Sequence, residues 1–104
     1  MGDLFEVLAI FGKKIILGEE RLAHILQSHP EMRGHLSKLT RALESPDEIR
    51  ASQYDAKVWL HYKFYKSLDK YIVAAVKVLN GNGFIITAYM TDRIKLGETL
   101  WKKK

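Results

Sequence analysis

The sequence predicts an α+β fold: two N-terminal helices packed on one face of an antiparallel sheet of about four strands, with the other face open. Apolar residues recur at helical spacing through residues 19–43 and alternate with a period of two from residue 57 onward. The sequence Asn-Gly-Asn-Gly at residues 80–83 then joins the last two strands as a hairpin. A chain of 104 residues is long enough for one core, so we expect residues 1–104 to form a single domain.

The first half of the chain is expected to contribute both helices. Gly12 separates two apolar segments, residues 5–10 and 14–17, which predict a short hairpin or a strand with a bent lead-in. A helix with acidic residues in its first turn follows and is ended by Pro30. Proline is also a favoured first residue of a helix, so the second helix is expected to run from Pro30 to about Leu43.

Strands are expected in the second half, at residues 47–53, 57–65, 71–79 and 84–90. Successive side chains of a strand point to opposite faces, so the alternation sorts them into two sets. The set expected beneath the helices is uncharged: Val58, Leu60, Tyr62, Phe64, Ile72, Ala74, Val76, Val78, Phe84, Ile86, Ala88 and Met90. The set expected on the open face is mixed: Trp59, His61, Lys63, Tyr65, Val73, Ala75, Lys77, Ile85, Thr87 and Tyr89.

Charge and composition narrow the classes of function. The net charge is +5, and residues 53–104 hold 10 Lys/Arg against 4 Asp/Glu, whereas residues 1–52 hold 7 against 8. A half-molecule this basic attracts phosphate-bearing partners, although a solvated surface would give the same charge. The absence of cysteine excludes a disulfide, a cysteine nucleophile and a thiolate zinc site, and it favours a cytoplasmic setting. The chain has no apolar run of membrane-spanning length and no signal-peptide pattern, so no membrane contact is expected.

Two histidines and a carboxylate, His24, His29 and Glu31, occur close together at the end of the first predicted helix. Histidine can give or take a proton near neutral pH, so the cluster suggests acid–base chemistry on an anionic substrate. A metal site is not expected, because five residues rotate a helix by about 500° and leave the two imidazoles on different faces. The structural interpretations are a surface residue for His24, a cap for His29 and a residue favoured by the helix dipole for Glu31.

The order of these motifs resembles that of a known family. The chain resembles the barnase/EndoU/colicin/RelE-like nuclease superfamily, most closely its small phage- and mobile-element-associated branch, over about residues 14–101. The resemblance rests on the helix with His24, then His29-Pro30-Glu31, a second helix, Pro46-Asp47-Glu48-Ile49, aromatic strands and Ile86-Thr87-Ala88-Tyr89. It implies RNA cleavage on the open face without metal or cofactor. Many relatives are toxins, so it also implies an antitoxin or immunity protein as a partner.

Cleavage of this kind uses the RNA 2′-OH as an internal nucleophile, and the enzyme supplies a base, an acid and cations for the phosphate. The candidates for proton transfer are His24, His29 and Glu31. Three further catalytic candidates are Lys63, for the charge on the phosphate, and Thr87 and Tyr89, for its orientation. The candidates for substrate binding are Arg21, His61 and Lys77 for phosphate charge, and Trp59 or Tyr65 for stacking a base. Relatives often place arginines on their catalytic strands, whereas the open face predicted here offers lysines, which lack the bidentate fork of arginine.

Two alternatives use the same fold without catalysis. One is a nucleic-acid-binding module that employs the basic half of the chain, and the other is a degenerate relative that only binds a partner. Cleavage in the presence of a chelator separates the nuclease from both alternatives. Binding that weakens steeply with salt separates the nucleic-acid-binding module from the interaction protein.

Overall fold

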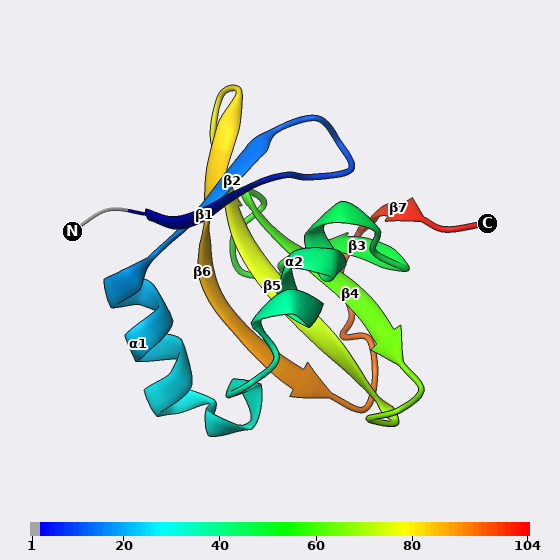
Figure 1. Cartoon of the computed structure of the whole chain (residues 1–104). Helices are drawn as coiled ribbons and strands as arrows, with labels where there is room; N and C mark the ends of the chain where they lie inside the picture. Colours follow the sequence, from blue (N-terminus) through cyan, green and yellow to red (C-terminus); the bar gives the residue numbers. More distant parts are fainter. Residues whose placement is uncertain (1–2) are drawn as a thin grey trace.

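The computed structural model describes residues 3–104, which form a curved seven-stranded sheet with two α-helices on one side (Figure 1). The strands are β1 (Asp3–Leu8), β2 (Lys14–Gly18), β3 (Glu48–Ala51), β4 (Val58–Tyr65), β5 (Lys70–Val78), β6 (Asn82–Thr91) and β7 (Thr99–Lys102). The helices are α1 (Glu19–Ser28) and α2 (Leu36–Glu44), with the 3-10 helix η1 (Pro30–Met32) between them. None of the helices in this part of the chain has the length and apolar character needed to cross a membrane.

The prediction of an antiparallel sheet of about four strands behind two N-terminal helices is wrong. The strand order within residues 3–104 is β1-β2-β6-β5-β4-β3-β7, and the pairing of β2 with β6 is parallel. The β1–β2 hairpin therefore precedes α1 and extends one edge of the sheet, while β3 and β7 extend the other. The pairings of β2 with β6 and of β3 with β7 join strands that are distant in the chain, so they leave no local pattern. Strand β7 is also too short to show alternation.

The second helix is shorter than predicted. Pro30 begins only η1, and Gly34 then adopts a positive φ of 81° before α2 starts at Leu36. A left-handed residue cannot continue a right-handed helix, so the predicted helix from Pro30 is interrupted. Helix α2 buries Leu39 and Leu43 as expected, whereas Leu36 at its start is 38% exposed.

The core lies between the helices and one face of the sheet. Its members include Ile15 and Leu17 of β2, Ile25 of α1, Met32 of η1, Leu39, Ala42 and Leu43 of α2, Ile72, Ala74 and Val76 of β5, and Ile85 and Ala88 of β6. Helix α2 crosses β4 and β5, whereas α1 lies beside β6 (Figure 1). Strand β2 pairs with only the first residues of β6, so α1 and η1 contact the remainder of β6.

The predicted faces of β4 are wrong. Lys63 Nζ donates a hydrogen bond to Ser45 O (2.8 Å) at the end of α2, and Tyr65 OH donates to Lys38 O (3.0 Å) within α2. Both side chains therefore lie on the helix side of the sheet, and so does His61, which is fully buried. The side facing away from the helices carries Val58, Leu60, Tyr62 and Phe64. Apolar and aromatic residues occur in both alternating sets of β4, so alternation alone does not tell which set faces the helices.

A β-bulge in β6 explains a second exchange of faces. Ala75 pairs with Thr87 and Val76 pairs with Ile85, so Ile86 is an extra residue on β6. An extra residue in one strand shifts the alternation by one position on either side of it.

The bulge separates the correct predictions for β6 from the wrong ones. Beyond it, the residues lie as predicted, with Ala88 and Met90 toward the helices and Thr87 and Tyr89 on the open side. Before it, the two predicted faces are exchanged: Ile85 is buried in the core, and Phe84 faces the open side and is 37% exposed. Ile86 was expected beneath the helices and instead lies partly exposed at the bulge.

Candidate active site

His29 is held at the junction of α1 and η1. Its backbone N–H donates to Ile25 O (2.7 Å) at the end of α1, and Pro30 begins η1 directly after it. The junction places the imidazole beside the open side of β6, where its ring centroid lies 5.6 Å from that of Tyr89. The His29 side chain is 35% exposed, so a substrate can reach it.

Glu31 in η1 faces the same histidine. Its Oε2 lies 3.5 Å from His29 Nδ1 and accepts a hydrogen bond of 3.5 Å from the backbone N–H of Met90. The carboxylate therefore connects η1 to the end of β6 and remains 40% exposed. An imidazole and a carboxylate in this arrangement can exchange protons with a bound substrate.

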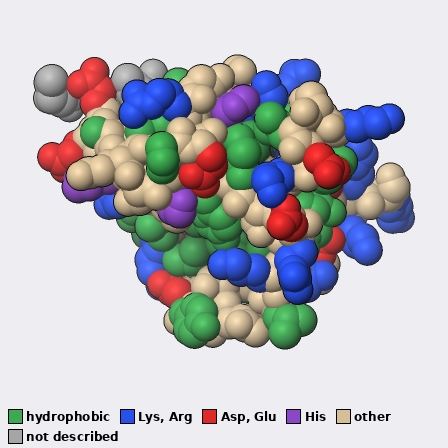
Figure 2. All heavy atoms as spheres, turned by 90° about the horizontal axis from the view of Figure 1, so that it is seen from below, with side chains coloured by type: hydrophobic (Ala, Val, Ile, Leu, Met, Phe, Trp, Pro, Cys, Tyr) green, Lys and Arg blue, Asp and Glu red, His purple; other side chains and the backbone are tan. Residues whose placement is uncertain are grey.

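Two tyrosines and a lysine line the sheet beside this pair. Lys95 Nζ lies 5.2 Å from the centroid of the Tyr89 ring, and the Lys95 backbone N–H donates to Tyr62 OH (3.2 Å). Burial raises the pKa of both phenols. The Tyr62 side chain is fully buried, so the partly exposed Tyr89 is the phenol that can donate a hydrogen bond to a substrate. Seen from below, histidine side chains border a hydrophobic area that has Lys and Arg side chains along its other border (Figure 2).

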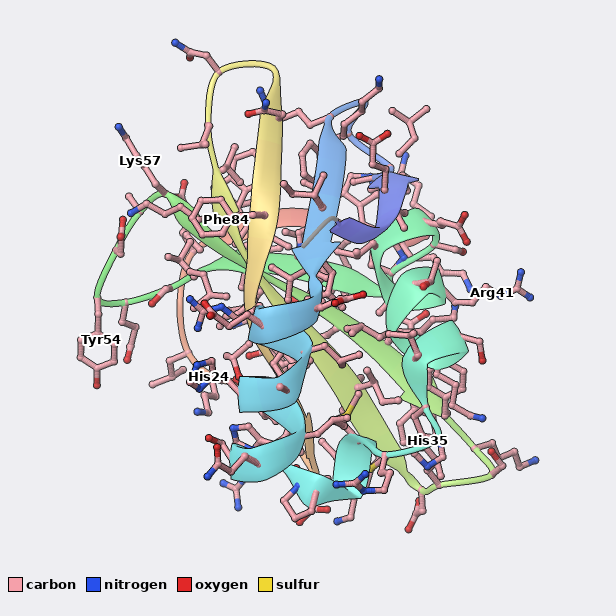
Figure 3. The ribbon with its side chains drawn as sticks, turned by 60° about the vertical axis from the view of Figure 1, so that its left-hand side comes forward. His24, His35, Arg41, Tyr54, Lys57 and Phe84 are labelled. Carbon is pink, nitrogen blue, oxygen red and sulfur yellow. The ribbon has the colours of Figure 1, made fainter. Side chains whose placement is uncertain are left out.

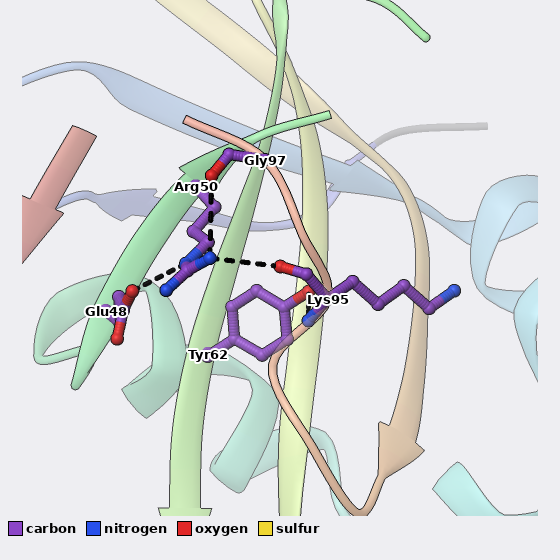
Figure 4. Close-up of polar contacts among 5 residues, drawn as sticks. All are labelled: Glu48, Arg50, Tyr62, Lys95 and Gly97. Atoms are coloured by element: carbon purple, nitrogen blue, oxygen red, sulfur yellow. Dashed lines mark hydrogen bonds and ion pairs between the residues drawn. The ribbon is translucent and has the colours of Figure 1, made fainter. Parts of the chain in front are cut away.

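Arg50 on β3 fixes the chain segment that carries Lys95. Its Nε donates to Glu48 Oε2 (2.6 Å), and its Nη1 donates to the carbonyls of Lys95 (3.4 Å) and Gly97 (3.5 Å). In Figure 4 these contacts hold the segment against β3 and Tyr62, while the Lys95 side chain extends away from Arg50. Arg50 thus positions Lys95 through the backbone, while its own charge is paired with that of Glu48.

His24 and Arg21 lie on α1, in a groove next to the His29–Glu31 pair. With Ser28 and Phe84 they line a space of about 550 Å³ between α1 and the first part of β6. His24 and Phe84 project to the same side of the molecule, away from α2 (Figure 3). Among the side chains that the structure describes, those of residues 6–104, no three His, Cys, Asp or Glu are grouped closely enough to hold a metal ion.

The four candidate residues on β4 do not lie on the face of the sheet that carries Tyr89 beside the His29–Glu31 pair. Trp59, His61, Lys63 and Tyr65 lie on the helix side of the sheet, opposite to Tyr89. Burial lowers the pKa of His61 to about 4, so its ring is neutral, and its Nδ1 donates to Trp59 O (3.2 Å). Trp59 packs edge-on against Phe11, with ring centroids 4.9 Å apart. Their positions do not support the binding roles predicted from the sequence.

The remaining predicted cation, Lys77, is paired with a carboxylate. Lys77 faces the open side as predicted, but its Nζ forms an ion pair with Asp55 Oδ2 (2.5 Å) at the other end of β5.

The sequence analysis did not identify three residues on this side of the sheet: Arg50, Tyr62 and Lys95. The available signal for Arg50 was its place in the predicted strand 47–53, together with the arginines that relatives often carry on their strands, although lysines were expected on this face.

The open side of the sheet thus combines an acid–base pair, an accessible phenol and a lysine, which is the chemistry that enzymes acting on phosphodiesters require. A family model described as phage-Barnase-EndoU-ColicinE5/D-RelE like nuclease2 matches residues 5–103. The chain therefore belongs to this nuclease family, which confirms the resemblance inferred from its motifs. No match was found among curated proteins or among solved structures.

Proposed function

We propose that the protein is a metal-independent endoribonuclease whose catalytic pair is His29 and Glu31. The observation that carries this proposal is the 3.5 Å approach of His29 Nδ1 to Glu31 Oε2 beside Tyr89 and Lys95. Membership of the nuclease family supports phosphodiester cleavage, and the site chemistry supports RNA as the substrate.

The proposed reaction needs two proton transfers. Glu31 takes the proton of the 2′-OH as that oxygen bonds to the adjacent phosphorus, and protonated His29 gives a proton to the departing 5′-oxygen. The P–O5′ bond breaks, which leaves a 2′,3′-cyclic phosphate on one product and a free 5′-OH on the other. Because Nδ1 faces Glu31, Nε2 is the nitrogen through which His29 reaches the leaving oxygen.

Charge on the phosphate increases during this reaction and requires stabilisation. Lys95 Nζ is linked to the pair through the Tyr89 ring, which both Lys95 and His29 contact. The phenol of Tyr89 and the hydroxyl of Thr87, both partly exposed, supply hydrogen-bond donors on the same side of the sheet. Arg50 acts as a positioning residue, because its guanidinium already binds Glu48 and two carbonyl groups.

The absence of a 2′-OH makes DNA a poor substrate for this site. RNA carries its nucleophile next to the reacting phosphorus, so proton transfer and charge stabilisation are enough for cleavage. DNA would require an activated water molecule in its place. We also propose that the activity serves as a toxin, restrained by an antitoxin or immunity protein, because cleavage of cellular RNA harms the producing cell.

Incubation of the purified protein with total RNA and with DNA in excess EDTA tests the proposal. We expect RNA fragments that end in a 2′,3′-cyclic phosphate or its hydrolysed 3′-phosphate, and no DNA products. Loss of cleavage on chelation, or equal cleavage of DNA, would contradict it. RNA binding without any cleavage would instead favour the non-catalytic nucleic-acid-binding module.

The pair itself is tested by Glu31→Gln, with Glu44→Gln as a matched control. Glu44 is an exposed carboxylate at the end of α2 and lies on the helix side. We expect Glu31→Gln to lower the cleavage rate about a hundredfold, because the amide cannot accept the proton, and Glu44→Gln to leave the rate unchanged. Equal rates for both variants would remove Glu31 from the mechanism.

A further inference from the structure

The groove next to the proposed catalytic pair has the composition of a nucleotide-binding site. Arg21, His24 and Ser28 recur at helical spacing on one side of α1, so their cation, imidazole and hydroxyl face the same space of about 550 Å³. Phe84 forms part of the opposite wall. Glu20 also lines the groove and repels an anion, so a phosphate is expected at His24, within reach of the long Arg21 side chain, rather than at Glu20.

Phe84 reaches this groove only because of the bulge at Ile86. In a regular strand, Phe84 would share a face with Ala88 and would point toward the helices. The extra residue turns it to the open side, where Tyr89 lies as well. Bulges often re-aim a side chain next to an active site, and this one leaves a phenylalanine 37% exposed where a buried residue was expected.

Phe84 and Tyr89 are too far apart to contact the same nucleotide. Five residues of extended strand span about 16 Å, and the bulge shortens this only slightly. Helix α1 runs beside β6, and its residues from Arg21 to Ser28 extend about 10 Å along the helix axis. A single RNA strand that lies along β6 and α1 would therefore contact Phe84 and Tyr89 through different nucleotides.

We infer that this groove is a second RNA subsite, in which Phe84 stacks a base and His24 and Arg21 bind a phosphate of a nucleotide beyond the cleaved bond. The inference rests on the proposed nuclease function, which places the cleaved bond at His29 and Glu31. Stacking on an aromatic ring and contact with cations are how proteins hold single strands without reading their sequence. The enzyme therefore prefers longer single-stranded RNA over a dinucleotide, with little dependence on base identity in the groove.

Steady-state cleavage of a dinucleoside monophosphate and of a single-stranded hexanucleotide tests the subsite. We expect wild-type kcat/KM to be at least tenfold higher for the hexanucleotide. Phe84→Ala removes about tenfold from the hexanucleotide value and leaves the dinucleotide value unchanged, because only the longer RNA reaches the groove. Phe84→Trp retains the preference, and Tyr54→Ala, which removes an aromatic residue 94% exposed outside the groove, has no effect.

The results distinguish the subsite from the catalytic site. An equal loss on both substrates, or no loss on either, would overturn the subsite while leaving the nuclease proposal intact. If the wild-type protein cleaves neither RNA, the nuclease proposal fails. The subsite is then measured by the fluorescence anisotropy of a labelled hexanucleotide, where weaker binding to Phe84→Ala than to Tyr54→Ala supports it and equal binding overturns it.

Discussion

The two faces of the sheet place the same residue type in opposite environments. His29 lies at the border of the open face, about one third exposed, with Glu31 Oε2 3.5 Å from its ring nitrogen. His61 lies on the helix face, fully buried, and within the described residues its Nε2 has no hydrogen-bond partner. A histidine therefore becomes a candidate for catalysis through access to substrate and a proton-transfer partner. Its presence on an alternating strand is not sufficient.

The largest expected effect comes from removing the accessible histidine. His29→Ala should lower the RNA cleavage rate by about 10²–10⁴-fold, because the leaving oxygen loses its proton donor, while thermal unfolding stays close to wild type. The matched control is His61→Leu, which removes an imidazole from the opposite face and should retain cleavage. If both variants keep full activity, the proton donor is not His29, and the exposure of a histidine does not determine its role in catalysis.

The second prediction tests the β-bulge at Ile86, which determines which side chains of β6 face the helices. Ile85→Ala should cost about 2–5 kcal/mol of unfolding free energy, because it opens a cavity in the core. Ile86→Ala should cost about 1 kcal/mol or less, since this side chain is already partly exposed. Urea unfolding of the two variants measures the difference directly. A larger loss for Ile86→Ala would mean that β6 has no bulge and that Phe84 points toward the helices.

Local sequence patterns predicted the parts of this fold that depend on neighbouring residues. Pro30 ended α1 as expected, and the alternation in β5 placed Ile72 and Val76 on the helix side correctly. The turn at residues 80–83 joined β5 to β6 in antiparallel pairing, as its glycines predict. His29 and Glu31 were identified because they occur close together at the end of the first predicted helix, and the structure places Glu31 Oε2 3.5 Å from His29 Nδ1.

The errors came from features that depend on distant residues. The phase of β4 depends on how it pairs with β5, and a sequence in which both sets of side chains are apolar or aromatic does not reveal it. The bulge at Ile86 shifts the alternation without any glycine to mark it. Lys95 was missed because hydrogen bonds from Arg50, on a strand far away in the sequence, fix its position.

The buried histidine on the helix face should make the stability of the protein depend on pH. The pKa of His61 is lowered to about 4 by burial, so the unfolded chain takes up this proton first as the pH falls below about 6.5. His61 therefore costs no stability near pH 7 and about 3 kcal/mol near pH 4. Between pH 7 and pH 4, the free energy of unfolding measured with urea should decrease less for His61→Leu than for wild type. Equal losses would mean that His61 is accessible to protons in the folded state.

The smallest expected effect concerns Lys95, whose ammonium lies over the Tyr89 ring beside the proposed pair. Lys95→Ala should lower kcat/KM for RNA about tenfold, because one charge-assisted contact to the phosphate is lost. Lys66→Ala is the matched control, since Lys66 is exposed in the β4–β5 turn. Lys95→Arg should restore most of the activity if the positive charge is what matters, and the dependence of KM on salt should be weaker in Lys95→Ala than in the control. Equal activity of the two alanine variants would show that the Lys95 side chain does not contact the phosphate.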